Sequence, residues 1–188
     1  MVELLYPVTP PRLAGEQTVS SEILPVVEPS GLVTGRTTRY ECHYGGKKPL
    51  HPVVHLHIID HLGRMYLQKR SALKRSWPHC WDFAVGGHIG YGEYSSEALF
   101  REAGEEIGFY DFNPLPLGDY VYECDREREL VLVFAAVGSY DLHPDNLEVE
   151  DGRWWEPDEI ADNLGKSIFT PNFEKEYDLF KDKLFSLL

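Results

Sequence analysis

The chain has few cysteines, a small share of basic residues and no long apolar segment. Its three cysteines, Cys42, Cys80 and Cys124, are widely spaced, which excludes a disulfide framework and fits a reducing cytoplasm. No apolar stretch approaches the roughly 20 residues of a membrane span, and the first residues lack the pattern of a secretory signal. With 18 Lys and Arg against 31 Asp and Glu, non-specific nucleic-acid binding is not expected. We therefore expect a cytoplasmic protein without membrane or nucleic-acid partners.

The composition is that of an ordinary globular chain. Of its 188 residues, 43% are hydrophobic and 13% are aromatic, which suffices for one core and argues against disorder. Residues 1–20 are rich in Pro, Thr, Ser and Gly and are interpreted as a flexible N-terminal arm. Residues 21–188 are expected to form a single domain.

Apolar periodicity and turn residues predict a mixture of strands and helices. Strands are expected at EILPVV (22–27), LVTGRTTR (32–39), HPVVHLHIID (51–60), RMYLQKRS (64–71), WDFAVGG (81–87), LGDYVYEC (117–124), ELVLVFAAV (129–137) and GRWW (152–155). Helices are expected from Ser95 or Ser96 to a stop at Gly108, at EPDEIADNL (156–164) and over NFEKEYDLFKDKLFSLL (172–188). This pattern predicts an α/β layered domain.

The helix after residue 95 carries an unusual density of acidic residues. Glu102, Glu105 and Glu106 are related as i, i+3 and i+4, so they share one face, beside the apolar stripe formed by Leu99, Ala103 and Ile107. Like charges at this spacing destabilise a helix, and acids near its C-terminus oppose the helix dipole. A solvated helix face is the ordinary interpretation. A divalent cation would remove both costs, and oxygen ligands suit Mg²⁺ accompanied by phosphate.

A basic segment and a glycine-rich loop precede this helix. Gly87, Gly90 and Gly92 would let the backbone approach a metal and phosphates closely. Between Met65 and Trp81 there is no acidic residue, whereas four basic residues occur: Lys69, Arg70, Lys74 and Arg75. They are interpreted either as a substrate-binding patch for a phosphorylated ligand or as a solvated loop, and the residues alone leave both open.

Residues 87–109 resemble the Nudix box, which is a Gly, five residues, a Glu, seven residues and then Arg-Glu-apolar-any-Glu-Glu-any-Gly-apolar. Every fixed position is met here, by Gly87, Glu93, Arg101, Glu102, Ala103, Glu105, Glu106, Gly108 and Phe109. A chance match over 23 residues is very improbable. The resemblance implies a Nudix fold, which is a mixed β-sheet sandwiched between α-helices. It also implies Mg²⁺- or Mn²⁺-dependent hydrolysis of a diphosphate linked to another group X.

The same resemblance implies roles for individual residues. Metal binding is implied for three carboxylates and one main-chain carbonyl, those of Glu102, Glu105, Glu106 and Gly87. One of the carboxylates, with Glu105 preferred, would instead act as the base on the attacking water. Arg101 would pair with Glu93 and hold the loop in shape. The cation would lower the pKa of a bound water and neutralise charge on the phosphoryl oxygens.

Other segments are similar to the type I isopentenyl-diphosphate isomerases, a branch of the same superfamily. These segments are RYECH, PLHPVV, LQKRS, WPHCWDFAVGGH and EREL. The isomerases hold a divalent metal with three His and two Glu, which fall on His43, His51, His88, Glu127 and Glu129. The spacing between the first two histidines is one residue longer here. Imidazoles with carboxylates suit Zn²⁺ or Mn²⁺, so the resemblance implies a second metal site.

Two departures favour a hydrolase over an isomerase. Gly86 stands where the isomerases need a reactive Cys, and glycine can neither deliver nor remove a proton. The isomerases also degrade the glutamate-rich box, which this chain keeps whole. The chain is therefore similar to the hydrolases with isomerase-like sequence, and its expected substrate is a small diphosphate compound such as a nucleoside diphosphate linked to X. An isomerase and a non-catalytic nucleotide sensor are the alternatives, and a homodimer is one of the open oligomeric states.

Other residues have both a functional and a structural interpretation. His55 and His57 share a strand face with His51 and are interpreted as packed or rim residues rather than as a separate zinc site. The indoles of Trp77, Trp81, Trp154 and Trp155 could stack a nucleobase, but large aromatics more often fill cores. One Trp of the 154–155 pair is expected to be buried and the other exposed. Glu148 or Glu150 could supply an alternative base, although a solvated loop is the commoner meaning.

Overall fold

The computed structural model describes residues 2–5, 22–144 and 147–188. The chain divides into two compact units, each assembled from three segments. Unit 1 comprises Met1–Val54, Gly87–Ala98 and Asp119–Leu132, and unit 2 comprises His55–Gly86, Leu99–Gly118 and Val133–Leu188. Most of the predicted N-terminal arm lies outside the described residues. In the described part of the chain, no helix is long and apolar enough to cross a membrane.

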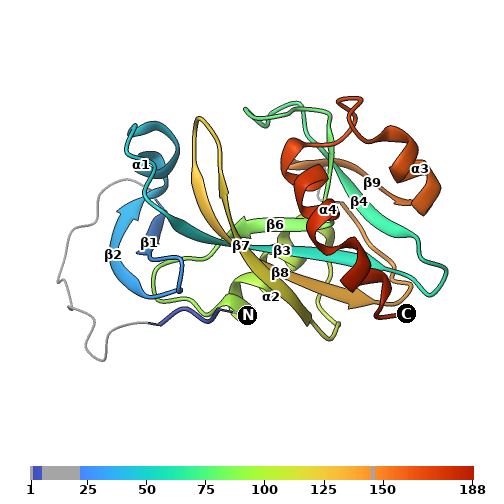
Figure 1. Cartoon of the computed structure of the whole chain (residues 1–188), viewed down its shortest axis with the longest axis horizontal. Helices are drawn as coiled ribbons and strands as arrows, with labels where there is room; N and C mark the ends of the chain where they lie inside the picture. The colour runs from blue at the N-terminus through green and yellow to red at the C-terminus, as the bar shows by residue number, and fades with distance from the viewer. Residues whose placement is uncertain (1, 6–21, 145–146) are drawn as a thin grey trace. The chain divides into compact units, whose positions relative to one another are not determined.

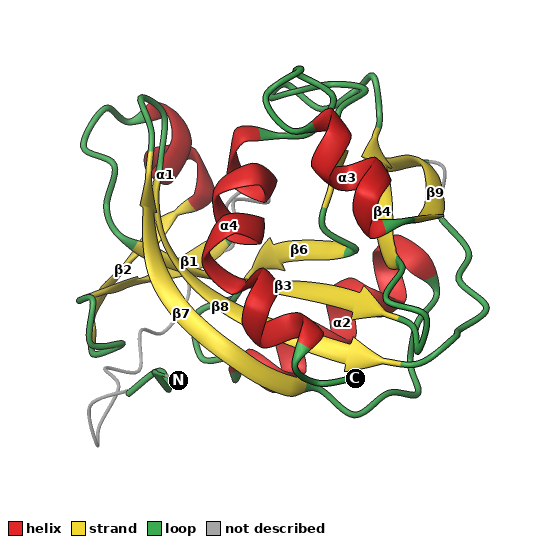
Figure 2. Ribbon diagram, turned by 45° about the vertical axis from the view of Figure 1, so that its right-hand side comes forward, coloured by secondary structure: helices red, strands yellow, loops and turns green. Residues whose placement is uncertain are grey.

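Seven strands form the main sheet (Figure 2). They are β3 (His51–Ile59), β4 (Met65–Arg70), β5 (Trp81–Asp82), β6 (Val85–His88), β7 (Leu115–Glu123), β8 (Arg128–Val137) and β9 (Val149–Trp155). The strand order is β5-β4-β3-β8-β7, with β6 paired to β3 and β9 paired to β4. A mixed sheet with flanking helices confirms the predicted α/β class. The predicted strand at 81–87 is divided into β5 and β6.

Unit 1 contains a separate hairpin and a short helix. The predicted strands β1 (Ile23–Val27) and β2 (Val33–Thr38) pair antiparallel, and α1 (Arg39–Tyr44) follows (Figure 1). The Thr38 hydroxyl caps α1 by accepting a hydrogen bond from the Glu41 N–H at 3.2 Å. No helix was expected at 39–44, because six residues are too few to show a periodic apolar stripe. The apolar side chains of this unit pack in a cluster that includes Val27, Val33, Leu50 and Leu130.

Unit 2 contains β4 and most of β3, two predicted strands that form a hairpin. Ile58 pairs with Tyr66 and Ile59 with Met65, and Gly63 in the connecting turn has a φ of 84°, a left-handed conformation that glycine adopts readily. β4 also pairs antiparallel with β9 along its whole length on the edge opposite β3, and through Gln68 and Lys69 with β5 on the same edge as β3. Apolar residues of the hairpin are fully buried, in agreement with the continuous β-like pattern of the sequence.

Three longer helices complete the fold. Helix α2 (Ser95–Ile107) ends at Gly108, whose φ is 64°, and the predicted stripe of Leu99, Ala103 and Ile107 is fully buried. Its first turn is capped by Glu97, which accepts a hydrogen bond from the Tyr94 N–H at 2.9 Å. Helices α3 (Pro157–Asn163) and α4 (Pro171–Phe185) both begin at a proline.

Candidate functional site

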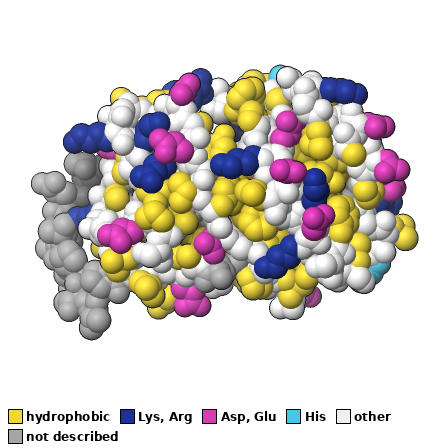
Figure 3. Space-filling model, in the orientation of Figure 1, with side chains coloured by type: hydrophobic (Ala, Val, Ile, Leu, Met, Phe, Trp, Pro, Cys, Tyr) yellow, Lys and Arg dark blue, Asp and Glu magenta, His cyan; other side chains and the backbone are white. Residues whose placement is uncertain are grey.

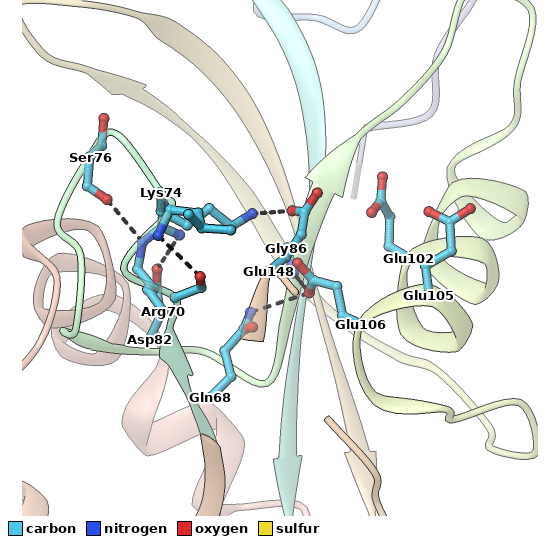
Figure 4. A network of polar contacts seen from close by, with 12 residues as sticks. Gln68, Arg70, Lys74, Ser76, Asp82, Gly86, Glu102, Glu105, Glu106 and Glu148 are labelled. Atoms are coloured by element: carbon cyan, nitrogen blue, oxygen red, sulfur yellow. Dashed lines mark hydrogen bonds and ion pairs between the residues drawn. The ribbon is translucent and has the colours of Figure 1, made fainter. Parts of the chain in front are cut away.

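Glu106 is a buried carboxylate near the end of α2. Its Oε2 atom accepts hydrogen bonds from the Gly86 N–H at 3.1 Å and from Gln68 Nε2 at 3.2 Å. Figure 4 shows Glu106 directed toward these two residues. Its other oxygen, Oε1, makes no hydrogen bond to the described part of the chain. Gln68 and Gly86 therefore fix the carboxylate and leave one oxygen available to a ligand.

The position of Glu106 makes its ionised form costly. Burial raises the pKa of its carboxyl to about 8, and the nearby carboxylates of Glu102 and Glu148 act in the same direction. Lys74 and the hydrogen bond from Gly86 lower the pKa in part. A carboxylate that is buried beside other acids is the arrangement that a divalent cation would stabilise.

Glu102 and Glu105 lie on the same helix and contact Arg101. Arg101 Nη1 lies 2.7 Å from Glu102 Oε1 and 3.5 Å from Glu105 Oε2. The side chain of Glu105 is 63% exposed and that of Glu102 is 14% exposed. Among the described residues, the carboxylates of Glu102, Glu105 and Glu106 do not form a group of ligand atoms within 4.8 Å of one another. Their joint role as metal ligands stays a prediction.

The basic side chains predicted to bind phosphate already have acidic partners in unit 2. Lys69 and His79 hold Glu150, with N–O distances of 3.0 and 2.7 Å. Lys74 pairs with Glu148, as Figure 4 shows. The sequence around residues 65–81 contains no acid, so these partners, which come from residues 148–150, were not foreseen.

Arg70 is also paired, whereas a phosphate-binding role was predicted for it. Arg70 Nη1 lies 3.2 Å from Asp82 Oδ2, and Arg70 Nε donates to the Ser76 carbonyl at 3.2 Å. Arg70 thereby ties the loop of residues 71–80 to β5 (Figure 4). Arg75 lies in the same loop, and its role in substrate binding, like that of the other three basic residues, stays a prediction.

The first part of the Nudix-box match lies in unit 1. Glu93 Oε2 accepts the Gly90 N–H at 2.8 Å, and the Glu93 N–H donates to the Gly90 carbonyl at 3.0 Å. These bonds close the glycine-rich loop on itself. Gly87 and Glu93 belong to unit 1 and Arg101 to unit 2. The metal-binding carbonyl of Gly87 and the Glu93–Arg101 pair stay predictions.

Unit 1 brings together the three histidines that the isomerase resemblance selected. His43, His51 and His88 are the only described group of three or more side chains whose ligand atoms lie within 4.8 Å of one another. His43 Nε2 faces His88 Nε2 at 3.0 Å. The ring centroids of the three imidazoles lie 5.1–5.4 Å apart. They converge from α1, β3 and β6, and β6 is distant in the sequence from the other two elements.

The two glutamates of this set take different positions. Glu127 Oε2 lies 2.7 Å from His43 Nδ1, on the opposite side of the ring from Nε2. Glu129 Oε1 lies 3.9 Å from His51 Nε2. The structure thus places Glu127 as a carboxylate that orients a histidine, an arrangement common around protein-bound metals. Direct coordination by either glutamate stays a prediction.

The donor set fits a transition metal. His51 is completely buried, its Nδ1 lies 3.0 Å from the Pro49 carbonyl, and its Nε2 has no hydrogen-bonding partner among the described residues. Burial lowers the pKa of His51 to about 4, so the ring is neutral at pH 7. With Nδ1 as the donor, Nε2 carries a lone pair that points into the cluster. The neutral ring of His51, two further imidazoles and nearby carboxylates form a donor set that suits Zn²⁺ or Mn²⁺.

His55 and His57 are packed residues, as predicted. Both are buried in unit 2, where His55 Nδ1 and His57 Nε2 lie 2.8 and 2.7 Å from the two oxygens of Glu176. Glu176, on α4, is itself completely buried. Sequence patterns gave no sign of this partner. The nearest available signal was the position of Glu176 next to Tyr177 on the apolar face of α4.

The isomerase cysteine position, Gly86, is crowded in this chain. A Cβ atom built on Gly86 would come within 2.2 Å of Cε2 of Phe83. The Phe83 ring is held in place by His55, whose ring stacks on it at a centroid distance of 3.7 Å. Position 86 therefore has no room for a side chain unless Phe83 moves.

The four tryptophans differ in how far their side chains are buried. Trp155 is buried, as expected for one member of the pair, whereas Trp154 is half-buried and packs edge-on against Tyr66 rather than being exposed. Trp81 contacts the ring of Trp155. Trp77 is 53% exposed. On the face shown in Figure 3 few histidine atoms reach the surface, and three of the histidines, His51, His55 and His57, are buried.

Comparison with known proteins places the chain in a family. Residues 49–173 match the family described as NUDIX domain. A protein of Nostoc sp. named as an uncharacterized Nudix hydrolase is 38% identical over 153 residues, which cover 77% of this chain and 86% of the relative. An isopentenyl-diphosphate Delta-isomerase of Mycolicibacterium vanbaalenii is 29% identical over 161 residues, covering 81% of this chain and 88% of the enzyme.

A solved structure agrees at the level of the fold. A crystal structure of a Deinococcus radiodurans protein superposes with a TM-score of 0.66 at 21% identity, covering 77% of this chain and 90% of that one. The family match spans well over half of the 188 residues. The chain belongs to the NUDIX family, and the predicted enzyme class, a Nudix hydrolase with isomerase-like relatives, is confirmed at that level.

Proposed function

We propose that this protein is a Mg²⁺- or Mn²⁺-dependent hydrolase that cleaves the diphosphate linkage of a nucleoside diphosphate joined to another moiety X. One observation supports this proposal above all. Glu106 is buried beside Glu102 and Glu148, its pKa is raised to about 8, and one of its oxygens has no hydrogen-bonding partner in the described chain. Such a carboxylate is costly to the fold unless a cation binds it.

In the proposed reaction, separate residues orient the buried carboxylate, hold its neighbours and accept the proton of the attacking water. Gln68 and the Gly86 N–H hold Glu106 in one orientation. Arg101 holds Glu102 at 2.7 Å and lies 3.5 Å from Glu105, whose exposed carboxylate accepts the proton of the attacking water. A divalent cation, when bound, would lower the pKa of that water and neutralise charge on the phosphate oxygens.

Lys69 and Lys74 would bind the diphosphate in place of their present acidic partners, Glu150 and Glu148. Lys69 and Lys74 have side chains that are 29% and 23% exposed, so their amines are accessible from solvent. A phosphate group that approaches them replaces the carboxylates of Glu150 and Glu148. Glu148, which directly precedes β9, is the alternative base once it is released from Lys74. Charge pairing of this kind positions phosphate without covalent chemistry.

A phosphate-release screen with Mg²⁺ tests the proposal. The substrates are nucleotide sugars, dinucleotides, ADP-ribose, CoA and isopentenyl diphosphate. For the best substrate, Glu106→Gln is expected to lower kcat by a factor of about 10² to 10⁴ while the circular dichroism spectrum stays unchanged. Asp162→Asn removes an exposed acid on α3 and is the matched control, expected to keep wild-type kcat. Unchanged turnover in Glu106→Gln at saturating Mg²⁺ would remove Glu106 from the mechanism.

A type I isopentenyl-diphosphate isomerase is the second candidate, supported by the histidine cluster of unit 1. The Phe83 ring weighs against it, because it fills the space in which the reactive side chain of an isomerase would start. We expect no exchange of solvent deuterium into isopentenyl diphosphate. Steady incorporation that depends on the metal would reverse the ranking of the two candidates.

A further inference from the structure

A small pocket in unit 2 lies apart from the residues assigned above. Its volume is about 130 Å³, and it is lined by Trp77, Gly165, Ser167, Phe169, Pro171 and Glu174. Sites that enclose a whole drug-sized ligand measure roughly 300–1,000 Å³. This pocket therefore suits one ring system and not an entire nucleotide.

The walls of the pocket are fixed by backbone hydrogen bonds. Trp81 N–H donates to the Ile168 carbonyl, and Thr170 N–H donates to the Trp81 carbonyl, both at 2.9 Å. Phe169, between these bonds, is almost fully buried and contacts the ring of Phe173 at a centroid distance of 5.0 Å. The segment of residues 165–171 is thus tied to β5, directly after the loop that carries Trp77.

Two residues of the lining have an unusual backbone conformation. Among the described residues, only four that are not glycine have positive φ angles, and two of them line this pocket. Trp77 has a φ of 51° and Ser167 a φ of 60°. A bulky residue in the left-handed region is an outlier, and such outliers gather at ligand sites. Here the conformation brings a half-exposed indole to the rim of a preformed pocket.

The chemistry of the lining points to a flat ring with an N–H donor. Trp77 makes no ring contact with another described residue, so one face of its indole is open to stacking. Glu174 Oε1 accepts the Gly165 N–H at 2.8 Å, while its Oε2 has no hydrogen-bonding partner in the described chain. An aromatic platform beside a carboxylate acceptor favours a heteroaromatic ring that carries an amino group. Base–aromatic stacking is a main source of affinity for nucleobases.

The pocket is near enough to the basic loop to serve the same ligand. Trp77 follows Lys74 by three residues, so their Cα atoms are at most roughly 11 Å apart. Lys74 in turn pairs with Glu148 and acts electrostatically on Glu106. A nucleotide has its base and its phosphates separated by a ribose, which is a span of this order.

We propose that this pocket binds the amino-bearing nucleobase of the substrate, with the ring stacked on Trp77 and the exocyclic amine donating to Glu174. Adenine and cytosine compounds would then be preferred over their hypoxanthine and uracil counterparts, in which an oxygen replaces the amine. The inference rests on the proposed diphosphate hydrolysis for its biological meaning, but the pocket is testable without that reaction.

The experiment measures dissociation constants by titration calorimetry on the full chain. The probes are AMP, IMP, CMP and UMP, which contain no diphosphate to cleave. Trp77→Ala is expected to weaken all four by about fivefold or more. Glu174→Ala is expected to weaken AMP and CMP similarly and to leave IMP and UMP unchanged, which also shows that the variant is folded. Leu73→Ala, an exposed residue of the same loop, is the control and should bind within twofold of wild type.

Several outcomes would overturn the proposal. They are wild-type affinities in both variants, equal affinity of the unmodified protein for each amino and oxo pair, and no measurable monophosphate binding at all. Hydrolysis of nucleoside diphosphates with no effect of Trp77→Ala on affinity would leave the proposed function standing and remove the pocket. A preference for AMP and CMP without any hydrolysis in the Mg²⁺ screen would support the pocket and contradict the proposed function.

Discussion

His43 and His88 face each other through their Nε2 atoms at 3.0 Å. Both nitrogens cannot carry a proton at this distance, so at least one presents its lone pair to the other ring. The Nε2 of His51 adds a third nitrogen that has no hydrogen-bonding partner in the described chain. The three Nε2 atoms of His43, His51 and His88 thus form a set of nitrogen donors that a metal ion would bind.

We expect the purified chain to bind one equivalent of Zn²⁺ or Mn²⁺ at this cluster. At a free metal concentration of 100 times Kd, stability should rise by about 2.7 kcal/mol, seen as a higher Tm. His51→Ala and His88→Ala should lose this increase. His61→Ala, which removes an exposed histidine between β3 and β4, should keep it. Equal metal content in all four proteins would place the ion elsewhere.

Substitution of Gly86 should destabilise the protein. A Cβ at this position lies 2.2 Å from the ring of Phe83, which His55 holds in place, so Gly86→Ala should cost about 1–3 kcal/mol in urea denaturation. Gly35→Ala is the control, because the nearest atom to its Cβ is 4.0 Å away. The cost at position 86 should shrink in a Phe83→Leu background. Gly86→Cys should fold less stably and gain no isomerase activity.

The stability of the metal-free protein should fall between about pH 4.5 and pH 8. Burial raises the folded-state pKa of Glu106 from 4.5 to about 8, so the folded state holds a proton that the unfolded state has released. The stabilisation that protonated Glu106 gives the folded state is fully present below pH 4.5 and is lost as the pH rises to 8. The free energy of unfolding should fall by about 1.4 kcal/mol for each pH unit in this window, a few kcal/mol in total.

Comparison of two proteins isolates this effect. Glu106→Gln should show a flatter profile than wild type over the same window, measured by urea denaturation in EDTA. Addition of Mg²⁺ should flatten the wild-type profile as well, because the cation stabilises the carboxylate. Parallel profiles for the two proteins in EDTA would mean that Glu106 titrates normally.

Glu176 should support the fold in the opposite pH range. Burial raises the pKa of Glu176, but the charge of His55 and the hydrogen bonds from His55 and His57 outweigh it and hold the pKa below its usual range. Its stabilisation is present above about pH 4.5 and is lost as the pH falls through the lowered pKa. Glu176→Gln should cost about 1–3 kcal/mol at pH 7 and reduce the loss in acid. Asp182→Asn on the same helix should do neither.

The sequence predicted the parts of this fold that depend on local patterns. The hairpin of β3 and β4, the burial of Leu99, Ala103 and Ile107, and the stop at Gly108 all follow from periodicity and turn chemistry. The joint position of His43, His51 and His88 followed only from a resemblance, because nothing local relates residues on three separate elements. Acidic partners from residues 148–150 and Glu176 could not be predicted at all, since those contacts exist only after folding.

The ion pairs of Lys69 with Glu150 and of Lys74 with Glu148 affect which anions these lysines can bind. Each lysine that reaches outward already holds a glutamate, so a singly charged metabolite would only trade one carboxylate for another and gain little. A pyrophosphate presents several charges at once and can displace Glu148 and Glu150 together. We therefore expect Lys69 and Lys74 to bind pyrophosphate in preference to singly charged anions, because only a ligand with several charges replaces both glutamates.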